Sequence, residues 1–284
     1  MSKLVAVIDG SVYSASVCEH AAWIANRAGS EIDVVHVLGR RNASSEPSNL
    51  SGSIGLGARS SLLAELAELD AQKARLAQQR GRAILDDAES LLASRGVENV
   101  HTRLRNGEIV ETVQECEIDA DLLVLGKRGE GADFDSGHLG SNLERVIRST
   151  SRPVLVASRG FKPISRVLFA FDGGKSSLKA IEFLSQAPHY NDLPCHVLMV
   201  GSESAEHRRQ VEGAVATLNK GGFEATGDIL QGQVETLITD QVETNGYDLV
   251  VMGAYGHSRI RNLIIGSTTT EMIRSCKVPV LLFR

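Results

Sequence analysis

The feature that most constrains this chain is an internal repeat, in which two parts of the sequence carry the same order of apolar runs and glycines. An apolar run ending in Asp-Gly occupies residues 3–10 and recurs at 166–173. A later run that ends in glycine occupies 121–126 and recurs at 248–253. Near-continuous apolar runs that alternate with helical patterns predict buried parallel strands with helices on both faces of a sheet. The sequence therefore predicts an α/β fold with two tandem open parallel sheets.

The repeat also predicts where the chain divides. We expect one domain at 1–159 and a second at 160–284, joined by the short Gly/Pro connection 159–163. The first domain is the longer because it carries an insertion at 40–95, in which a Ser/Gly/Asn-rich loop precedes a leucine-rich helix. The leucine spacing predicts a helix of two or more segments with a break near Gly81. We expect this helix to be an amphipathic cover on the sheet, the alternative being a surface for a partner.

Charge and length exclude several classes of protein. The 284 residues carry a net charge of −5, which is no electrostatic footprint for nucleic acid or an anionic membrane. No apolar run approaches the ~18 residues of a membrane span, and the first run is too short for a signal peptide. The four cysteines are scattered, with no Cys-x-x-Cys pair. We therefore expect a cytoplasmic protein with no nucleic-acid partner and no membrane span.

The strongest chemical pattern follows the apolar run at 248–253. Gly253, Gly256 and Gly266 are separated by two and nine residues, and Ser267 then opens a helical segment. Glycines allow close approach to the backbone, and a helix N-terminus attracts phosphate through its free N–H groups and its dipole. Further hydroxyl groups or positive charges come from Thr268, His257, Arg259 and Arg261. The pattern predicts a site for nucleotide phosphates, the alternative being a loop whose glycines only make turns and whose serine only caps the helix.

The spacing Gly-x2-Gly-x9-Gly-Ser resembles the ATP-binding signature of the universal stress protein family, and the flanks 248–252 and 278–282 resemble that family too. The resemblance implies strand order 3-2-1-4-5 in each domain and ATP, with or without Mg²⁺, along the ends of strands 1 and 4. It implies that adenine meets the end of strand 2 and that the glycine loop meets the phosphates. The expected binding residues are Asp172, Gly173, Met199, Val200, Met252, Gly253, Gly256, His257, Arg259, Gly266, Ser267 and Thr268.

Asp172 has two possible roles. It ends strand 1 of the second domain, where an ionised carboxylate accepts hydrogen bonds from ribose hydroxyls. It also precedes Gly173 and Gly174, and so is placed to cap the following helix. Members of the family often have Ser or Thr directly after this acid, and the two glycines here put the ribose side of the site in question.

The first domain departs further from the signature. Ten residues, not nine, separate Gly129 from Gly140. The charged residues of this loop are Lys127, Arg128, Glu130, Asp133, Asp135 and His138. Carboxylates close to a triphosphate are unfavourable, and the cations only partly offset them. Ser141-x-x-Glu144 is a capping-box pattern that explains the serine without a ligand. Three outcomes stay open for the first domain, which are ATP, a different ligand, or no ligand.

No catalytic constellation is visible. The sequence contains no Gly-x4-Gly-Lys-Ser/Thr, no Gly-x-Ser-x-Gly and no zinc-ligand spacing, and His257 is the one acid–base candidate. The leading hypothesis is an ATP-binding stress-response protein with a regulatory role, whose domains form an intramolecular pseudo-dimer and which could also form a homodimer. The alternatives are a slow nucleotide hydrolase or nucleotidyl-transfer enzyme, and a ligand-free interaction scaffold.

Overall fold

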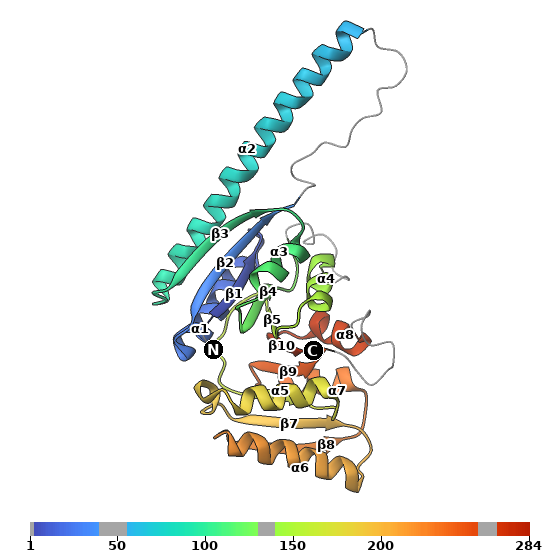
Figure 1. Cartoon of the computed structure of the whole chain (residues 1–284). Helices are drawn as coiled ribbons and strands as arrows, with labels where there is room; N and C mark the ends of the chain where they lie inside the picture. Colours follow the sequence, from blue (N-terminus) through green and yellow to red (C-terminus); the bar gives the residue numbers. More distant parts are fainter. Residues whose placement is uncertain (1–2, 40–55, 130–139, 255–265) are drawn as a thin grey trace.

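The computed structural model describes residues 3–39, 56–129, 140–254 and 266–284 (Figure 1). The strands of the first half are β1 (Lys3–Ile8), β2 (Glu31–Leu38), β3 (Val100–Asn106), β4 (Leu122–Gly126) and β5 (Val154–Ala157). Its helices are α1 (Ser14–Ala28), α2 (Leu56–Ser94), α3 (Ile109–Cys116) and α4 (Ser141–Ser149).

The second half repeats this order from residue 167 onward. Its strands are β6 (Val167–Ala170), β7 (Cys195–Val200), β8 (Ala225–Leu230), β9 (Leu249–Gly253) and β10 (Val280–Phe283). Its helices are α5 (Lys175–Ser185), α6 (Ala205–Lys220), α7 (Val234–Asn245) and α8 (Ser267–Ser275), with a short 3-10 helix at Pro188–Tyr190.

The ten strands form one sheet in the order β3-β2-β1-β4-β5-β10-β9-β6-β7-β8. Within each half the order is 3-2-1-4-5, as the resemblance implied, and the strands are parallel. The two predicted sheets are not separate, however, because β5 and β10 pair antiparallel, with Leu155 opposite Leu281. This pairing satisfies the backbone groups that each half would otherwise leave open at its strand 5 edge.

Helices cover both faces of the sheet, which confirms the predicted α/β class. Successive strand residues alternate between two apolar cores, for example Leu4 in one and Val5 in the other. The first core is completed by α1, the C-terminal part of α2, α5 and α6, and the second by α3, α4, α7 and α8. In the part of the chain that the structure describes, no helix is both long and apolar enough to cross a membrane.

Helix α2 differs from its prediction. It runs without a break through Gly81, and only its C-terminal part, with Leu85 and Leu92, is buried against the sheet. A Cβ atom at Gly81 would lie 2.7 Å from Cδ1 of Leu104 and 3.0 Å from Cδ2 of His36. The glycine therefore lets the helix approach the sheet closely instead of ending it. N-terminal to Gly81 the helix stands away from the sheet, so it is not a cover along its whole length (Figure 1).

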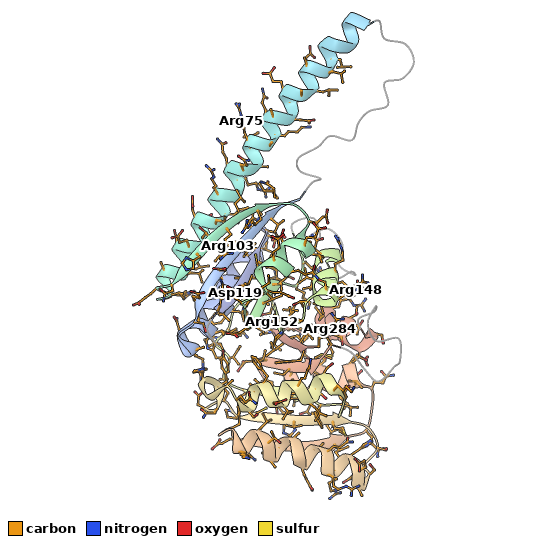
Figure 2. The ribbon with its side chains drawn as sticks, in the orientation of Figure 1. Arg75, Arg103, Asp119, Arg148, Arg152 and Arg284 are labelled. Atoms are coloured by element: carbon orange, nitrogen blue, oxygen red, sulfur yellow. The ribbon has the colours of Figure 1, made fainter. Side chains whose placement is uncertain are left out.

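A side chain from each half also donates hydrogen bonds to carbonyl groups at a helix C-terminus of the other half. Lys127, which follows β4, donates from Nζ to the carbonyl oxygen of Cys276 at the C-terminus of α8, at 3.0 Å. Arg284, which follows β10, donates to the carbonyl oxygen of Arg148 at 2.7 Å and to that of Thr150 at 3.3 Å, at the C-terminus of α4. Figure 2 shows Arg148 and Arg284 at this junction. Cations at helix C-termini interact favourably with the helix dipole.

Candidate functional site

The predicted site lies at the carboxyl ends of two inner strands in the second half. Strands β6 and β9 are parallel neighbours, with Ala170 opposite Met252. Asp172 follows β6 and Gly253 ends β9, so both lie at the carboxyl ends of these strands, which we call the β6–β9 edge. The strand order reverses between β6 and β9, and open α/β sheets bind ligands at such switch points.

Asp172 organises the loop at this edge. Its Oδ1 accepts the Gly174 backbone N–H at 2.9 Å and the Ser177 hydroxyl at 2.6 Å. Gly174 is the N-cap of α5, so the carboxylate fixes the turn directly before that helix without being its N-cap. The side chain is nevertheless exposed, and a carboxylate has about four acceptor positions. Holding this turn and binding a ribose are therefore compatible roles for Asp172.

Gln210 joins this edge from α6, a contact that the sequence analysis missed. Gly173 has φ of +70°, and a Cβ atom there would lie 2.7 Å from Oε1 of Gln210. The amide also donates from Nε2 to Oε1 of Glu206 at 3.2 Å. No local pattern marks Gln210, because the contact joins residues far apart in the sequence. A polar amide thus lies over the backbone turn that follows β6.

The predicted binding residues at the ends of β7 and β9, among them Met199 and Val200 for adenine, belong mostly to the core. Met199 is 4% exposed and Met252 is 6% exposed, and they pack in opposite cores of the sheet. Val200 is half-buried at the end of β7. Gly253 has a packing role, because a Cβ atom there would lie 3.0 Å from Cβ of Ser176 in α5. These residues shape the edge, and most of their side chains are committed to packing.

The predicted phosphate residues in the described part of the chain lie at the start of α8. Gly266 is the N-cap, with φ of −57°, and the first turn contains no acidic residue. Ser267 is exposed and Thr268 is half-exposed. The adjacent Thr269, which the sequence analysis did not single out, donates its hydroxyl to the carbonyl oxygen of Ala254 at 3.2 Å. This bond fixes the helix start beside the end of β9, where free N–H groups can meet an anion.

Three predicted residues cannot be placed at this edge. Gly256, His257 and Arg259 lie outside the residues that the structure describes, as does Arg261, the further cation that the sequence offered. Where the chain is described, no three His, Cys, Asp or Glu side chains gather to hold a metal ion.

The matching edge of the first half, between β1 and β4, has a different surface. Asp9 accepts the Ser11 backbone N–H at 3.0 Å. A Cβ atom at Gly129 would lie 2.8 Å from Oδ2 of Asp9, so the loop after β4 lies against the carboxylate. A Cβ atom at Gly10 would lie 2.6 Å from Cδ1 of Ile84 in α2. The chain's own groups therefore occupy the space around Asp9.

The start of α4 corrects one prediction. The helix begins at Ser141 with Gly140 as N-cap, so the serine is the first helical residue and not the N-cap that a capping box requires. Glu144 lies in the first turn of α4, where an acid disfavours a bound anion. The predicted loop residues Glu130, Asp133, Asp135 and His138 lie outside the described residues.

Lys127 is unavailable to a phosphate of the first half, because its amine is committed to Cys276 across the junction. Burial lowers the pKa of this lysine to about 8, with the neighbouring Arg128 adding to the effect. The sequence analysis counted Lys127 as a cation of the loop, and the tertiary structure directs it to the other half.

Comparison with known proteins agrees with this architecture. A profile of the universal stress protein family matches residues 1–158 and 197–284. The universal stress protein Slr1230 of Synechocystis sp. is 39% identical over 287 residues, covering 100% of both chains. The universal stress protein MJ0531 of Methanocaldococcus jannaschii is 30% identical over 163 residues, covering 55% of this chain and 82% of its own.

A solved structure shares the fold over nearly the whole length. The universal stress protein of Archaeoglobus fulgidus DSM 4304 superposes with a TM-score of 0.73 at 20% identity, covering 99% of this chain and 98% of its own. The profile match and the full-length relative both extend over the two halves of the chain. This chain belongs to the universal stress protein family.

Proposed function

We propose that this protein binds ATP at the β6–β9 edge and acts as a regulatory protein in a stress response. The observation that carries the proposal is the start of α8, which Thr269 holds against the end of β9 and whose first turn contains no acid. A phosphate placed there meets free backbone N–H groups and the positive end of the helix dipole. Family membership supports the stress-response role.

The residues at this edge have distinct roles in the proposed complex. The phosphates lie at Gly266, Ser267 and Thr268, and the Asp172 carboxylate accepts hydrogen bonds from the ribose. The end of β7, at Met199 and Val200, supports the adenine.

Three further residues enter this proposal from the sequence alone. Gly256 matches the second glycine of the family signature, and the basic side chains His257 and Arg259 belong to the nine residues that follow it. Mg²⁺ would enter bound to the triphosphate, which supplies oxygen ligands that this ion prefers.

The two halves contribute unequally to this function. We assign ATP binding to the proposed domain 160–284 and none to 1–159. In the first half the backbone at Gly129 lies against the Asp9 carboxylate, and Glu144 places an acid in the first turn of α4. The first domain then completes the sheet and holds the C-terminus of α8 through Lys127.

Calorimetric titration of the full chain with Mg-ATP tests the proposal. We expect one site per chain, with GTP as the control for base selectivity and phosphate release no faster than a slow background. An absence of binding would favour the scaffold alternative. Two equal sites would overturn the assignment to the second half, and rapid turnover would overturn the regulatory role.

A further inference from the structure

The N-terminal part of α2 forms a projecting arm, which we define as residues 62–80. It leaves the sheet at Gly81 and stands away from the rest of the molecule, with Arg75 on its surface (Figures 1 and 2). Six large apolar side chains are strongly exposed in the described residues, and three of them, Leu63, Leu69 and Leu76, lie on the arm. Their exposed fractions are 52%, 50% and 65%, so the arm carries apolar surface that the described part of the chain leaves open.

The leucines of the arm follow a heptad. Leu62, Leu69 and Leu76 recur every seven residues, and Leu66 lies between the first two at a spacing of four and three. This is the a/d spacing of a coiled-coil seam, with Lys73 and Arg80 at the following a positions. The arm is 19 residues long, or about 28 Å of helix, which gives a partner helix a seam of six a and d positions, four of them leucine.

Charge is unevenly distributed along the arm. Acidic side chains come first, at Glu65, Glu68 and Asp70, and basic ones follow, at Lys73, Arg75 and Arg80. In a parallel pair, the acidic segment of one arm would lie beside the acidic segment of the other, and the basic segment beside the basic segment. Lys73 would then face the partner's Lys73 across the seam, and Arg80 would face the partner's Arg80. Two antiparallel copies place the acidic segment of each beside the basic segment of the other.

We propose that the arm pairs with the arm of a second copy of this chain, as an antiparallel two-stranded coiled coil. The register that matches the charges places Leu66 opposite the partner's Leu76, and Leu69 opposite the partner's Lys73. In this register Arg80 lies near the partner's Glu65. Polar residues at a positions specify register and orientation in coiled coils, and here they select the antiparallel pair. The pairing buries leucines that are exposed in the single chain.

Sedimentation velocity of the full chain across a range of concentrations tests the pairing. We expect a monomer–dimer equilibrium whose dissociation constant rises at least 100-fold in Leu69→Asp/Leu76→Asp. The control Ala71→Asp/Gln78→Asp adds the same charges to exposed positions of the same helix outside the seam, and should leave the dissociation constant within threefold of the parent's. A chain that stays monomeric, or a dimer that both variants weaken equally, would overturn the proposal.

Cysteine cross-linking tests the orientation. The four native cysteines are buried, so introduced ones are the accessible thiols. Protein with Leu66→Cys, mixed with protein with Leu76→Cys and gently oxidised, should form the mixed disulfide in preference to either homodisulfide. Circular dichroism of each variant checks that α2 is intact. Dominant homodisulfides would show parallel pairing and overturn the proposal.

Discussion

The β1–β4 and β6–β9 edges begin from the same Asp-Gly pair, but different side chains lie over it. In the first half Ile84 of α2 covers Gly10, whereas in the second half Gln210 of α6 covers Gly173. Both glycines have positive φ, at +80° and +70°, so the backbone turn is the same. The helix that follows strand 2 therefore decides whether the turn meets an apolar or a polar group.

The end of strand 2 shows the same contrast. His36 on β2 is buried, with Nδ1 2.8 Å from the carbonyl oxygen of Ile8, and Gly81 brings α2 close to its ring. At the matching position of β7 the residue is Met199, which has no polar atom to engage β6. The comparison teaches that a repeated fold preserves the strand ends, while the covering helix determines which side chains lie over them.

The sharpest test of this contrast, with the largest expected effect, is Gly266→Val. A side chain at the start of α8 would occupy the space of a phosphate, and we expect ATP affinity to fall at least tenfold, about 1.4 kcal/mol. Gly266 has φ of −57°, which valine tolerates, so the melting temperature without nucleotide should not fall from backbone strain. Calorimetry and thermal melting measure the two effects.

The matched control is Gly140→Val, at the start of α4. Gly140 also has φ of −57°, and a Cβ atom there would meet nothing closer than 3.6 Å. ATP affinity should therefore stay unchanged. Loss of binding in this variant would place the working site in the first half.

A second test uses the pH dependence of the junction between the halves. Lys127 has a pKa of about 8 in the folded protein, below its ordinary 10.5, because burial disfavours the charged amine. The unfolded chain therefore binds more protons between these values, so this lysine makes the free energy of unfolding rise with pH from about 8 to 10.5.

Relative to Lys127→Met, the parent should gain about 1–2 kcal/mol over that interval, measured by urea unfolding. Arg284→Met is the counterpart in the other half, and the parent's advantage over it should not vary in this interval, because a guanidinium stays protonated. A constant difference between the parent and Lys127→Met would contradict the effect of burial on this amine.

Asp172→Asn should weaken ATP binding about fivefold, or about 1 kcal/mol. The amide oxygen can still accept from Gly174 and Ser177, while the charge that strengthens a ribose hydrogen bond is lost. Asp9→Asn, the matched change in the first half, should leave affinity unchanged in the same titration. Equal effects of the two changes would remove the distinction between the edges.

The smallest expected effect is that of Gln210→Ala, about threefold weaker ATP binding, because one polar group beside Gly173 is lost. Ile84→Gln places the same amide over the first edge and should not create a second site in calorimetry. A second site in that variant would show that the covering helix alone had kept the first half from binding.

Much of this architecture was predictable from the sequence, because the signals are local. Apolar runs such as 248–253 are long enough to identify buried strands, and their repeat predicted the same fold twice, while the strand order came from the family resemblance. The glycine and hydroxyl residues at 266–268 identified a helix start next to a strand end, where the structure has α8. These features depend on residues close together in the chain.

Other features were decided only by the tertiary structure. The join of β5 to β10, the continuation of α2 through Gly81, and the contacts of Gln210 and Lys127 all connect residues distant in sequence. The same residue type served opposite purposes, since glycine ends β9 but continues α2. A local pattern reports which conformations a segment can adopt, whereas the neighbours that it meets depend on how the helices cross the sheet.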